Sequence, residues 1–431
     1  MLALLRSNFA LLFGIALLMT GHGLQGTLLG LRTAIERFGT MTSGLVLAGY
    51  FLGLLLGSLE GPKLIVRVGH VRVFAAMSAI ASTTILFHLL LIEPVSWFLF
   101  RFVTGFCLAG VYVVAESWLN AGTPNAMRGR LLSVYLVLQY AGLAAGPLLL
   151  NLAAPEDFRP FVLVSVLLSL AVVPMLLSAV PAPPVAPGRR LDLRDLWRFS
   201  PLAFVGIAGI GVVQGALWSL GPVFARTIGL DLVGVTGLMA VVAVGGLALQ
   251  WPFGRLSDQF DRRHVLIFAG LAAAAALLPL PLLIGAGTLT LFLLFFLFAG
   301  LALPVYSISV AHLNDFLETE EMVAASGALL LANGIGAVAG PLLAAAAMSL
   351  FGPWGFPILL ALVMLGVGGF ALYRLTVRPP VPSEERTRFV ALPQLSPVAL
   401  ELAQEQTSEE APDPTPADAR PEAEAASGGG G

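Results

Sequence analysis

The sequence predicts an all-α membrane protein with twelve transmembrane helices in two six-helix bundles related by a pseudo-twofold axis. Three observations support this fold class. The 431 residues are 58% hydrophobic and only 11% charged, whereas soluble domains carry roughly 25% charged residues. Apolar stretches of about 20 residues recur along the chain, and each can cross the ~30 Å hydrocarbon layer as a helix. The third observation is an internal repeat that relates the two halves of the sequence.

The apolar stretches have the pattern of helices and not of barrel strands. Stretches such as "LAAAAALLPLPLLIG" do not alternate between apolar and polar residues, and a helix satisfies its own backbone inside lipid. The first stretch, from Phe9 to Leu31, is too long for a signal-peptide core and is expected to be the first span. The spans are expected near residues 9–31, 42–60, 71–92, 96–120, 130–152, 159–180, 200–222, 233–253, 265–286, 288–313, 323–349 and 354–376.

The distribution of charge and proline predicts the domain organisation and the orientation. The longest loop between spans is Pro-rich and then basic, and the final segment has a composition that cannot bury apolar surface. We expect an N-terminal bundle at 1–180, a cytoplasmic linker at 181–199, a C-terminal bundle at 200–376 and a disordered cytoplasmic tail at 377–431. Placing both termini in the cytoplasm puts all but five of the 23 Lys and Arg residues on that side, in accord with the positive-inside rule.

The two halves align with each other at a nearly constant offset. The matched residues, 189 to 194 positions apart, are Gln25 with Gln214, Tyr112 with Tyr306, Gln139 with Asn333, Gly146 with Gly340, and Pro147 with Pro341. Both copies contain six spans and so share one orientation. A parallel repeat of this kind predicts a pseudo-twofold axis along the membrane normal, with a solute site between the halves near the bilayer midplane.

Three motifs resemble those of the major facilitator superfamily. "GRLSDQFDRR" at 254–263 resembles its signature loop, with Asp261 in place of the usual second glycine. "RFVTGFCLAG" resembles its fourth-span pattern, in which Arg101 and Gly105 match, and "GLAAGP" resembles part of its fifth-span antiporter pattern. "VYVVAESWLNAGTP" is similar to a bacterial subgroup without an assigned substrate. The resemblance covers residues 5–376 and implies transport of small solutes by two bundles that rock about a central site, often with a coupled proton.

The signature loop forms a short turn between spans 8 and 9 and is the expected gate. Asp258 can face the positive end of a neighbouring helix and pair with an arginine, a bistable contact worth ~1–3 kcal/mol. The alternative is that the arginines only anchor topology. The first-half copy of the loop has Val66 in place of the aspartate. The expected gating residues are Gly254, Arg255, Asp258, Arg262, Arg263, Arg67, Gly69 and Arg72.

Polar and aromatic residues inside the spans are the candidates for a substrate cavity, because polar groups in lipid are costly. The resemblance implies that spans 1, 4, 7 and 10 line the cavity, with spans 2, 5, 8 and 11 beside it. The alternative for each residue is a hydrogen bond to a neighbouring helix, or packing for the aromatic residues. The expected cavity residues are His22, Gln25, Tyr112, Glu116, Asn120, Gln139, Tyr140, Gln214, Trp218, Tyr306 and Asn333.

Arg101, Glu116 and His22 are the candidates for proton coupling. Glu116 could bind and release a proton, or it could pair with a loop arginine such as Arg128 or Arg130. Arg101 is singled out by the resemblance, although Glu93 could hold it as a static pair. His22 could titrate near neutral pH or act only as a hydrogen-bonded cavity residue.

Small residues at every fourth position should let helices approach closely, and prolines should bend them. Gly49, Gly53 and Gly57 form one such run. These features suit bundles that slide as well as static packing. The other residues expected to pack or bend helices are Gly142, Gly146, Pro147, Gly336, Gly340 and Pro341.

Several functions lack support in the sequence. The formal net charge of −2 gives no reason to expect nucleic acid as a partner. The sequence has no P-loop, no nucleophile elbow and no metal-spaced cluster of His and Cys, so we expect no enzyme activity, no cofactor and no metal.

The combined prediction is a secondary transporter of the bacterial inner membrane that works by alternating access. The leading subtype is a proton-coupled exporter of small, partly apolar compounds, an antiporter whose partners are its solute, protons and the lipid bilayer. One alternative is an importer of a small organic acid or sugar, in which Arg101 or His22 would meet the substrate. Another is a non-transporting membrane scaffold or sensor with the same fold.

Overall fold

The structure, a computed structural model, describes residues 9–121, 125–176, 192–283, 285, 287–317, 319–377, 387 and 389. Of residues 119–121, 125–130, 175, 319, 320 and 322–324 it describes the backbone alone. The described secondary structure is helical, and no strand occurs in this part of the chain. Most of the predicted linker and almost all of the predicted tail lie outside the described residues.

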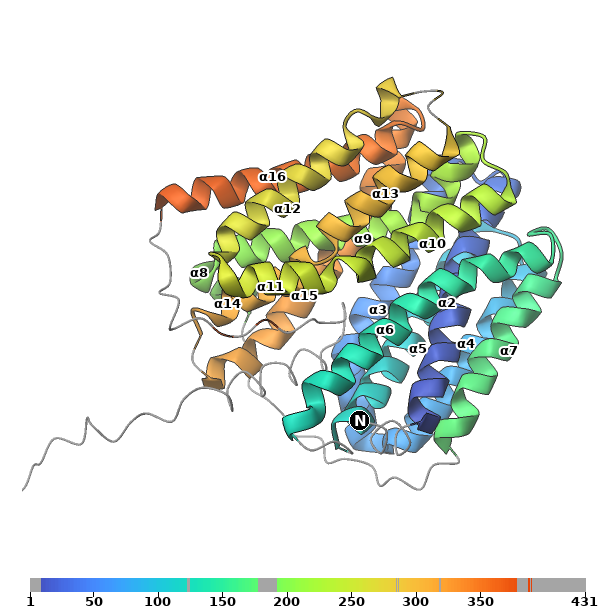
Figure 1. The fold of residues 1–431 in the computed structure, drawn as a ribbon. Coiled ribbons are helices and arrows are strands. Elements are labelled where there is room, and N and C mark those ends of the chain that lie inside the picture. The colour runs from blue at the N-terminus through green and yellow to red at the C-terminus, as the bar shows by residue number, and fades with distance from the viewer. Residues whose placement is uncertain are drawn as a thin grey trace, which may run out of the picture.

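The helices of the N-terminal half coincide with the first six predicted spans (Figure 1). Gly39 precedes the second helix and Gly69 separates the second from the third, with φ of 75° and 96°, a backbone conformation that favours glycine. The helices are α2 (Phe9–Ile35), α3 (Thr40–Val68), α4 (His70–Leu90), α5 (Pro94–Ala121), α6 (Asn125–Leu149), which a 3₁₀ turn (Leu150–Leu152) extends, and α7 (Arg159–Leu176).

The C-terminal half begins with a short helix that the sequence did not predict, α8 (Leu193–Phe199), in the last part of the linker. A capping box between Asp192 and Asp195 starts it. The remaining helices are α9 (Pro201–Thr227), α10 (Leu232–Ala248), α11 (Gln250–Gln259), α12 (Arg262–Leu277), followed by a 3₁₀ turn (Leu280–Leu282), α13 (Thr288–Ala302), α14 (Val305–Asn314), α15 (Thr319–Phe351) and α16 (Gly355–Val377).

Two predicted spans are each built from two helices. Span 8 is interrupted at Leu249, between α10 and α11, and span 10 is interrupted at Leu303 and Pro304, between α13 and α14. Pro304 has no N–H to donate to the preceding turn, which explains the second break. Pro147 lies near the end of α6, and α15 continues as a helix through Pro341.

The predicted fold class is confirmed. Eleven helical segments of the described chain are long and apolar enough to cross a membrane, with α10 joined to α11 and α13 joined to α14. The described part of α7 adds a shorter apolar helix, Arg159–Pro174. Together they account for the twelve predicted spans.

The two halves pack alike, as the repeat predicts. A Cβ on Gly146 of α6 would lie 2.3 Å from a carbonyl oxygen of α2, and a Cβ on Gly340 of α15 would lie 2.4 Å from a carbonyl oxygen of α9. One turn earlier, the corresponding closest distances are 2.5 Å at Gly142 and 2.2 Å at Gly336. Any side chain at these four positions would push the helices apart. The first helix of each half therefore rests on the fifth in the same way.

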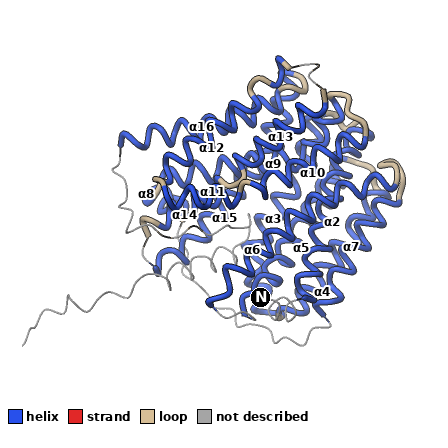
Figure 2. Tube along the Cα trace, in the orientation of Figure 1, coloured by secondary structure: helices blue, strands red, loops and turns tan. Residues whose placement is uncertain are grey.

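The halves touch at one end and diverge at the other (Figures 1 and 2). Asn151, which follows α6, donates a hydrogen bond from Nδ2 to Thr236 Oγ1 of α10 at 3.0 Å. Near the same end, a Cβ on Gly30 of α2 would lie 3.1 Å from the Ser219 carbonyl oxygen of α9. At the opposite end, α11 and α14 of the second half spread away from the beginning of α2.

Candidate functional site

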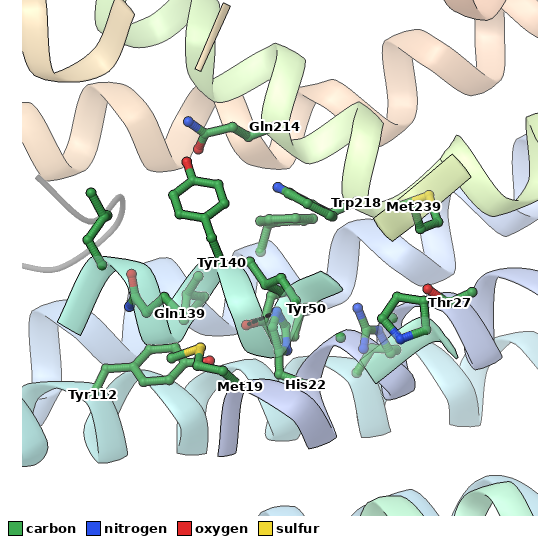
Figure 3. Close-up of a pocket in the computed structure, with 18 of the residues that line it drawn as sticks. Met19, His22, Thr27, Tyr50, Tyr112, Gln139, Tyr140, Gln214, Trp218 and Met239 are labelled. Atoms are coloured by element: carbon green, nitrogen blue, oxygen red, sulfur yellow. Dashed lines mark hydrogen bonds between the residues drawn. The ribbon is translucent and has the colours of Figure 1, made fainter. Parts of the chain in front are cut away.

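A cavity lies between the two halves. Residues of α2, α3, α5 and α6 line it from the N-terminal half, and residues of α9 and α10 line it from the C-terminal half. Its empty space, including the part that is open to solvent, is about 1040 Å³. Figure 3 shows Gln214 and Trp218 entering from one half, opposite His22 and Tyr112 of the other.

Many of the residues that the sequence singled out lie together at this cavity. Its lining includes His22, Arg101, Tyr112, Glu116, Gln139, Tyr140, Gln214 and Trp218. Gln139 is half-buried, and Gln214 is only 2% exposed, so neither side chain faces outward from the bundle. Figure 3 shows the Tyr140 ring of α6 extending toward Gln214 of α9, across the boundary between the halves.

Gln25, Tyr306 and Asn333 do not line this cavity, although each is buried. Asn333 donates a hydrogen bond from Nδ2 to the Ile207 carbonyl oxygen at 3.2 Å, so it joins α15 to α9. That is the helix-to-helix role considered as its alternative. The side chain of Asn120 lies outside the described residues.

One end of the cavity is cationic. The guanidinium carbon of Arg101 on α5 lies 4.5 Å from the ring centroid of Tyr50 on α3, a cation–π contact. The His22 ring of α2 stacks on the same tyrosine with centroids 5.1 Å apart, and its Nε2 lies 3.5 Å from the Tyr50 hydroxyl. Glu93, the static partner considered for Arg101, is exposed, and Arg101 forms no ion pair within the described chain. Tyr50 therefore connects three helices at this point.

Glu116 is an acidic residue in the lining of the same cavity. It is 1% exposed, and its Oε1 accepts a hydrogen bond of 2.6 Å from the Tyr135 hydroxyl of α6. Fifteen residues separate it from Arg101 on α5, or about 22 Å at a rise of ~1.5 Å per residue. The two residues therefore lie about four turns apart on α5. The side chains of its alternative partners, Arg128 and Arg130, lie outside the described residues.

Most of the remaining lining is apolar and was not predicted from the sequence. The lining residues that the sequence analysis did not name include Met19, Thr27, Tyr50, Phe51, Leu54, Leu136, Leu143 and Met239. Tyr50 alone had a usable signal, since it is a tyrosine inside an apolar span, next to Gly49 of the glycine run. The apolar residues cannot be told from ordinary packing residues by type.

The predicted gate at the α11–α12 turn contacts Phe389, which follows α16 in the sequence. Asp258 Oδ1 accepts a hydrogen bond from the Phe389 backbone nitrogen at 2.9 Å. The Phe389 ring covers Gly254, where a Cβ would lie 2.6 Å from a ring carbon. Arg255 stacks on the Trp251 ring at 3.9 Å.

A buried ion pair lies behind this turn. Arg262 Nε lies 2.9 Å from Asp315 Oδ2, and the two side chains are 1% and 3% exposed. Thr387 donates hydrogen bonds of 3.0 Å from both its backbone nitrogen and its hydroxyl to Asp315, and its carbonyl oxygen accepts one from Arg262. Asp315 was not predicted, because it follows span 10 and lies far from the signature loop in the sequence.

Arg263 pairs with Asp261 of its own turn at 2.6 Å, and Asp261 also caps α12 by accepting from the Arg263 backbone nitrogen at 2.9 Å. Burial raises the pKa of Asp261, but the hydrogen bonds and charge of Arg263 outweigh it and hold the pKa below its ordinary value. In the first-half copy, Arg67 and Arg72 are exposed and Gly69 links α3 to α4. Within the described residues, no group of three His, Cys, Asp or Glu residues could hold a metal ion.

Two repeated bundles of membrane-spanning helices around a shared, mostly apolar cavity define the architecture of a secondary transporter. Comparison with known proteins gives the family. Residues 11–303 and 233–409 match the profile of the Major Facilitator Superfamily. The chain belongs to this superfamily, whose members are transporters and not enzymes.

The related proteins extend over most of the chain. The uncharacterized MFS-type transporter YcaD of Escherichia fergusonii is 29% identical over 342 residues, which cover 78% of this chain and 87% of the relative. An uncharacterized MFS-type transporter of Enterobacter sp. (strain 638) is 29% identical over 345 residues, with the same coverage of 78% and 87%.

Solved structures share the fold. A mutant of the nucleoside transporter NupG superposes with a TM-score of 0.71 at 14% identity, over 86% of this chain and 100% of that chain. A bacterial homologue of the human lysosomal transporter Spinster, in an inward-facing and unoccupied conformation, gives a TM-score of 0.62 at 16% identity, over 94% and 97%.

Proposed function

We propose that this transporter exports small, partly apolar compounds across the bacterial inner membrane by alternating access, in exchange for protons. The observation that carries the proposal is the cavity between the halves, which is apolar over most of its lining and contains Glu116 and Arg101, both of α5. An apolar cavity favours solutes that leave water easily. A single buried carboxyl offers a place for one proton.

In the proposed orientation, the cavity faces the cytoplasm. The halves diverge at the end that carries Arg262 and Arg263, which the positive-inside rule assigns to the cytoplasmic side. Residues 1–180 and 200–376 would move as two bodies. Rocking toward the other state would separate Asn151 from Thr236 and bring the α11–α12 turn against the N-terminal half.

Glu116 is the proposed proton-binding group. The hydrogen bond from Tyr135 is charge-assisted when Glu116 is ionised, so it stabilises the carboxylate inside the bundle. Protonation removes the charge and weakens this contact between α5 and α6. Proton binding and the packing of α5 on α6 are therefore linked at the hydrogen bond between Glu116 and Tyr135.

Flux in proteoliposomes tests the proposal. Vesicles containing the purified protein and a pH-sensitive dye would be loaded with aromatic acids, amides and alcohols, whose exit is followed by mass spectrometry. We expect an inward proton gradient to accelerate the exit of at least one class, with acidification of the interior. Glu116→Gln should abolish acidification, and Glu93→Gln, which changes an exposed acid, should leave it intact.

Two results would reject the proposal. Movement of solute and proton in the same direction would indicate the importer. Absence of solute flux, with correctly folded protein, would indicate the scaffold or sensor.

A further inference from the structure

Arg101 differs from every other buried arginine in the described part of the chain. The others pair with a carboxylate, as Arg32–Glu36, Arg262–Asp315 and Arg263–Asp261. Arg101 is 2% exposed, and its Nε and Nη1 have no hydrogen-bond partner among the described residues. Removing a guanidinium from water is unfavourable unless an anion compensates it. Among the described residues, no carboxylate compensates this charge.

The compensating anion can reach Arg101 from the cavity. Arg101 is part of the cavity lining, and the Tyr50 ring on one side of the guanidinium supplies a weak attraction and no charge. Glu116 lies about 22 Å away along α5 at the helical rise of ~1.5 Å per residue. Its carboxylate already accepts a hydrogen bond from Tyr135. The space in front of Arg101 thus lacks a protein acid within the described residues.

We infer that Arg101 binds the carboxylate of the transported solute, and that the solute is an organic monoanion with an aromatic or other apolar body. The inference rests on the proposed transport function of the same cavity. A guanidinium presents a planar fork of donors that matches a carboxylate in two hydrogen bonds. One arginine balances one negative charge, and no lysine or second arginine occurs among the described lining residues.

The rest of the lining fits the uncharged part of such a solute. Trp218, Phe51, Leu54 and Met239 offer aromatic and aliphatic surface in the same cavity. A second carboxylate on the solute would lack a cation and would meet Glu116 at the far end. A phosphate ester with two charges has the same disadvantage. Monocarboxylates are therefore favoured over dicarboxylates and phosphate esters.

Equilibrium binding to the purified full chain tests this without any need for transport. Indole-3-acetate and benzoate would be compared with their neutral amides, indole-3-acetamide and benzamide, by calorimetry and by the shift of the thermal midpoint. We expect the acids to bind and to raise the midpoint, with the amides at least about tenfold weaker, the factor for one hydrogen bond to a charged group. Arg101→Gln should remove this preference, and the control Arg198→Gln, which changes a side chain that is 80% exposed, should keep it.

A second measurement does not depend on the choice of solute. If Arg101 serves to bind a ligand, its replacement by glutamine removes an uncompensated buried charge. The solute-free Arg101→Gln protein should therefore have a thermal midpoint equal to or above that of the wild type. Arg101→Lys should keep the positive charge but lose the planar set of guanidinium donors, and should bind the acids with intermediate affinity. A clear fall in the midpoint of the solute-free Arg101→Gln protein would indicate a structural role and refute the inference.

The outcomes separate the two proposals. Equal binding of acids and amides, binding of neither acid, or an unchanged preference in Arg101→Gln overturns the carboxylate site, whatever the flux assay shows. Arg101-dependent binding without solute flux supports the carboxylate site and contradicts the transport function.

Discussion

Replacing Gly53 by alanine should separate α3 from α5 and destabilise the N-terminal half. A Cβ on Gly53 would lie 1.9 Å from the Phe102 carbonyl oxygen and 2.8 Å from the Phe106 nitrogen, whereas ordinary contacts begin at 3.4 Å. Relief requires the helices to move apart by about 1.5 Å, because both atoms belong to a backbone that no rotamer change can displace.

The expected magnitude follows from two opposing effects. Overpacking of a well-packed core costs ~1–3 kcal/mol, and a backbone clash of this size belongs at the upper end. Alanine gains ~1 kcal/mol over glycine in helix propensity. We therefore expect Gly53→Ala to lower the free energy of unfolding by about 2 kcal/mol, which is the difference between these estimates.

The same displacement should reach the cavity. Tyr50 lies one turn from Gly53 on α3, and its ring is the contact of Arg101 at 4.5 Å. Relief of the clash requires α3 to move by about 1.5 Å, to the distance of ordinary van der Waals contact. This movement would weaken the contact between Tyr50 and Arg101 and shift the Arg101 side chain. Solute binding should therefore fall together with stability.

Gly61→Ala is the matched control on the same helix. Its Cβ would meet Gly110 Cα at 3.7 Å, an ordinary contact, so only the gain in helix propensity of up to ~1 kcal/mol applies. Both variants would be unfolded by titration with denaturing detergent, and solute binding would be measured by calorimetry. Equal midpoints for Gly53→Ala and Gly61→Ala would refute the reasoning from helix contact.

Three further predictions concern single side chains. Asp258→Asn should slow solute flux in proteoliposomes without reducing the amount of folded protein, because it removes the charge at the contact with Phe389; unchanged flux would remove Asp258 from the gate. Asp261→Ala should lower stability by about 1 kcal/mol at pH 7 through loss of the cap and of the pair with Arg263. Because the pKa of Asp261 is lowered in the folded protein, this difference between wild type and variant should persist above the ordinary carboxyl pKa and disappear as pH falls through the lowered value; a pH-independent difference in thermal midpoint would contradict it. Asn333→Ala should cost about 1 kcal/mol through the lost bond to α9 and leave solute affinity unchanged, as measured by thermal unfolding and calorimetry.

The sequence alone was sufficient for the spans, the repeat and the family. Inside lipid every backbone group must be satisfied within its own helix, so hydropathy over about 20 residues reports each span without knowledge of its neighbours. The repeat was visible because residues such as Gly146 and Gly340 must be small wherever two helix backbones touch. The first requirement is local to each span, and the second concerns one residue type at a fixed position.

The direction in which each polar side chain points was decided by the tertiary structure. His22 lines the cavity and Gln25, three residues later, does not. Tyr112 lines it, and Tyr306, its counterpart in the repeat, is buried elsewhere. The lack of a carboxylate partner for Arg101 was equally invisible, since Glu93 was an acceptable partner in the sequence. The rotation of a helix about its axis depends on contacts with residues far away in the chain, and those contacts decide which polar group meets another helix and which faces the cavity.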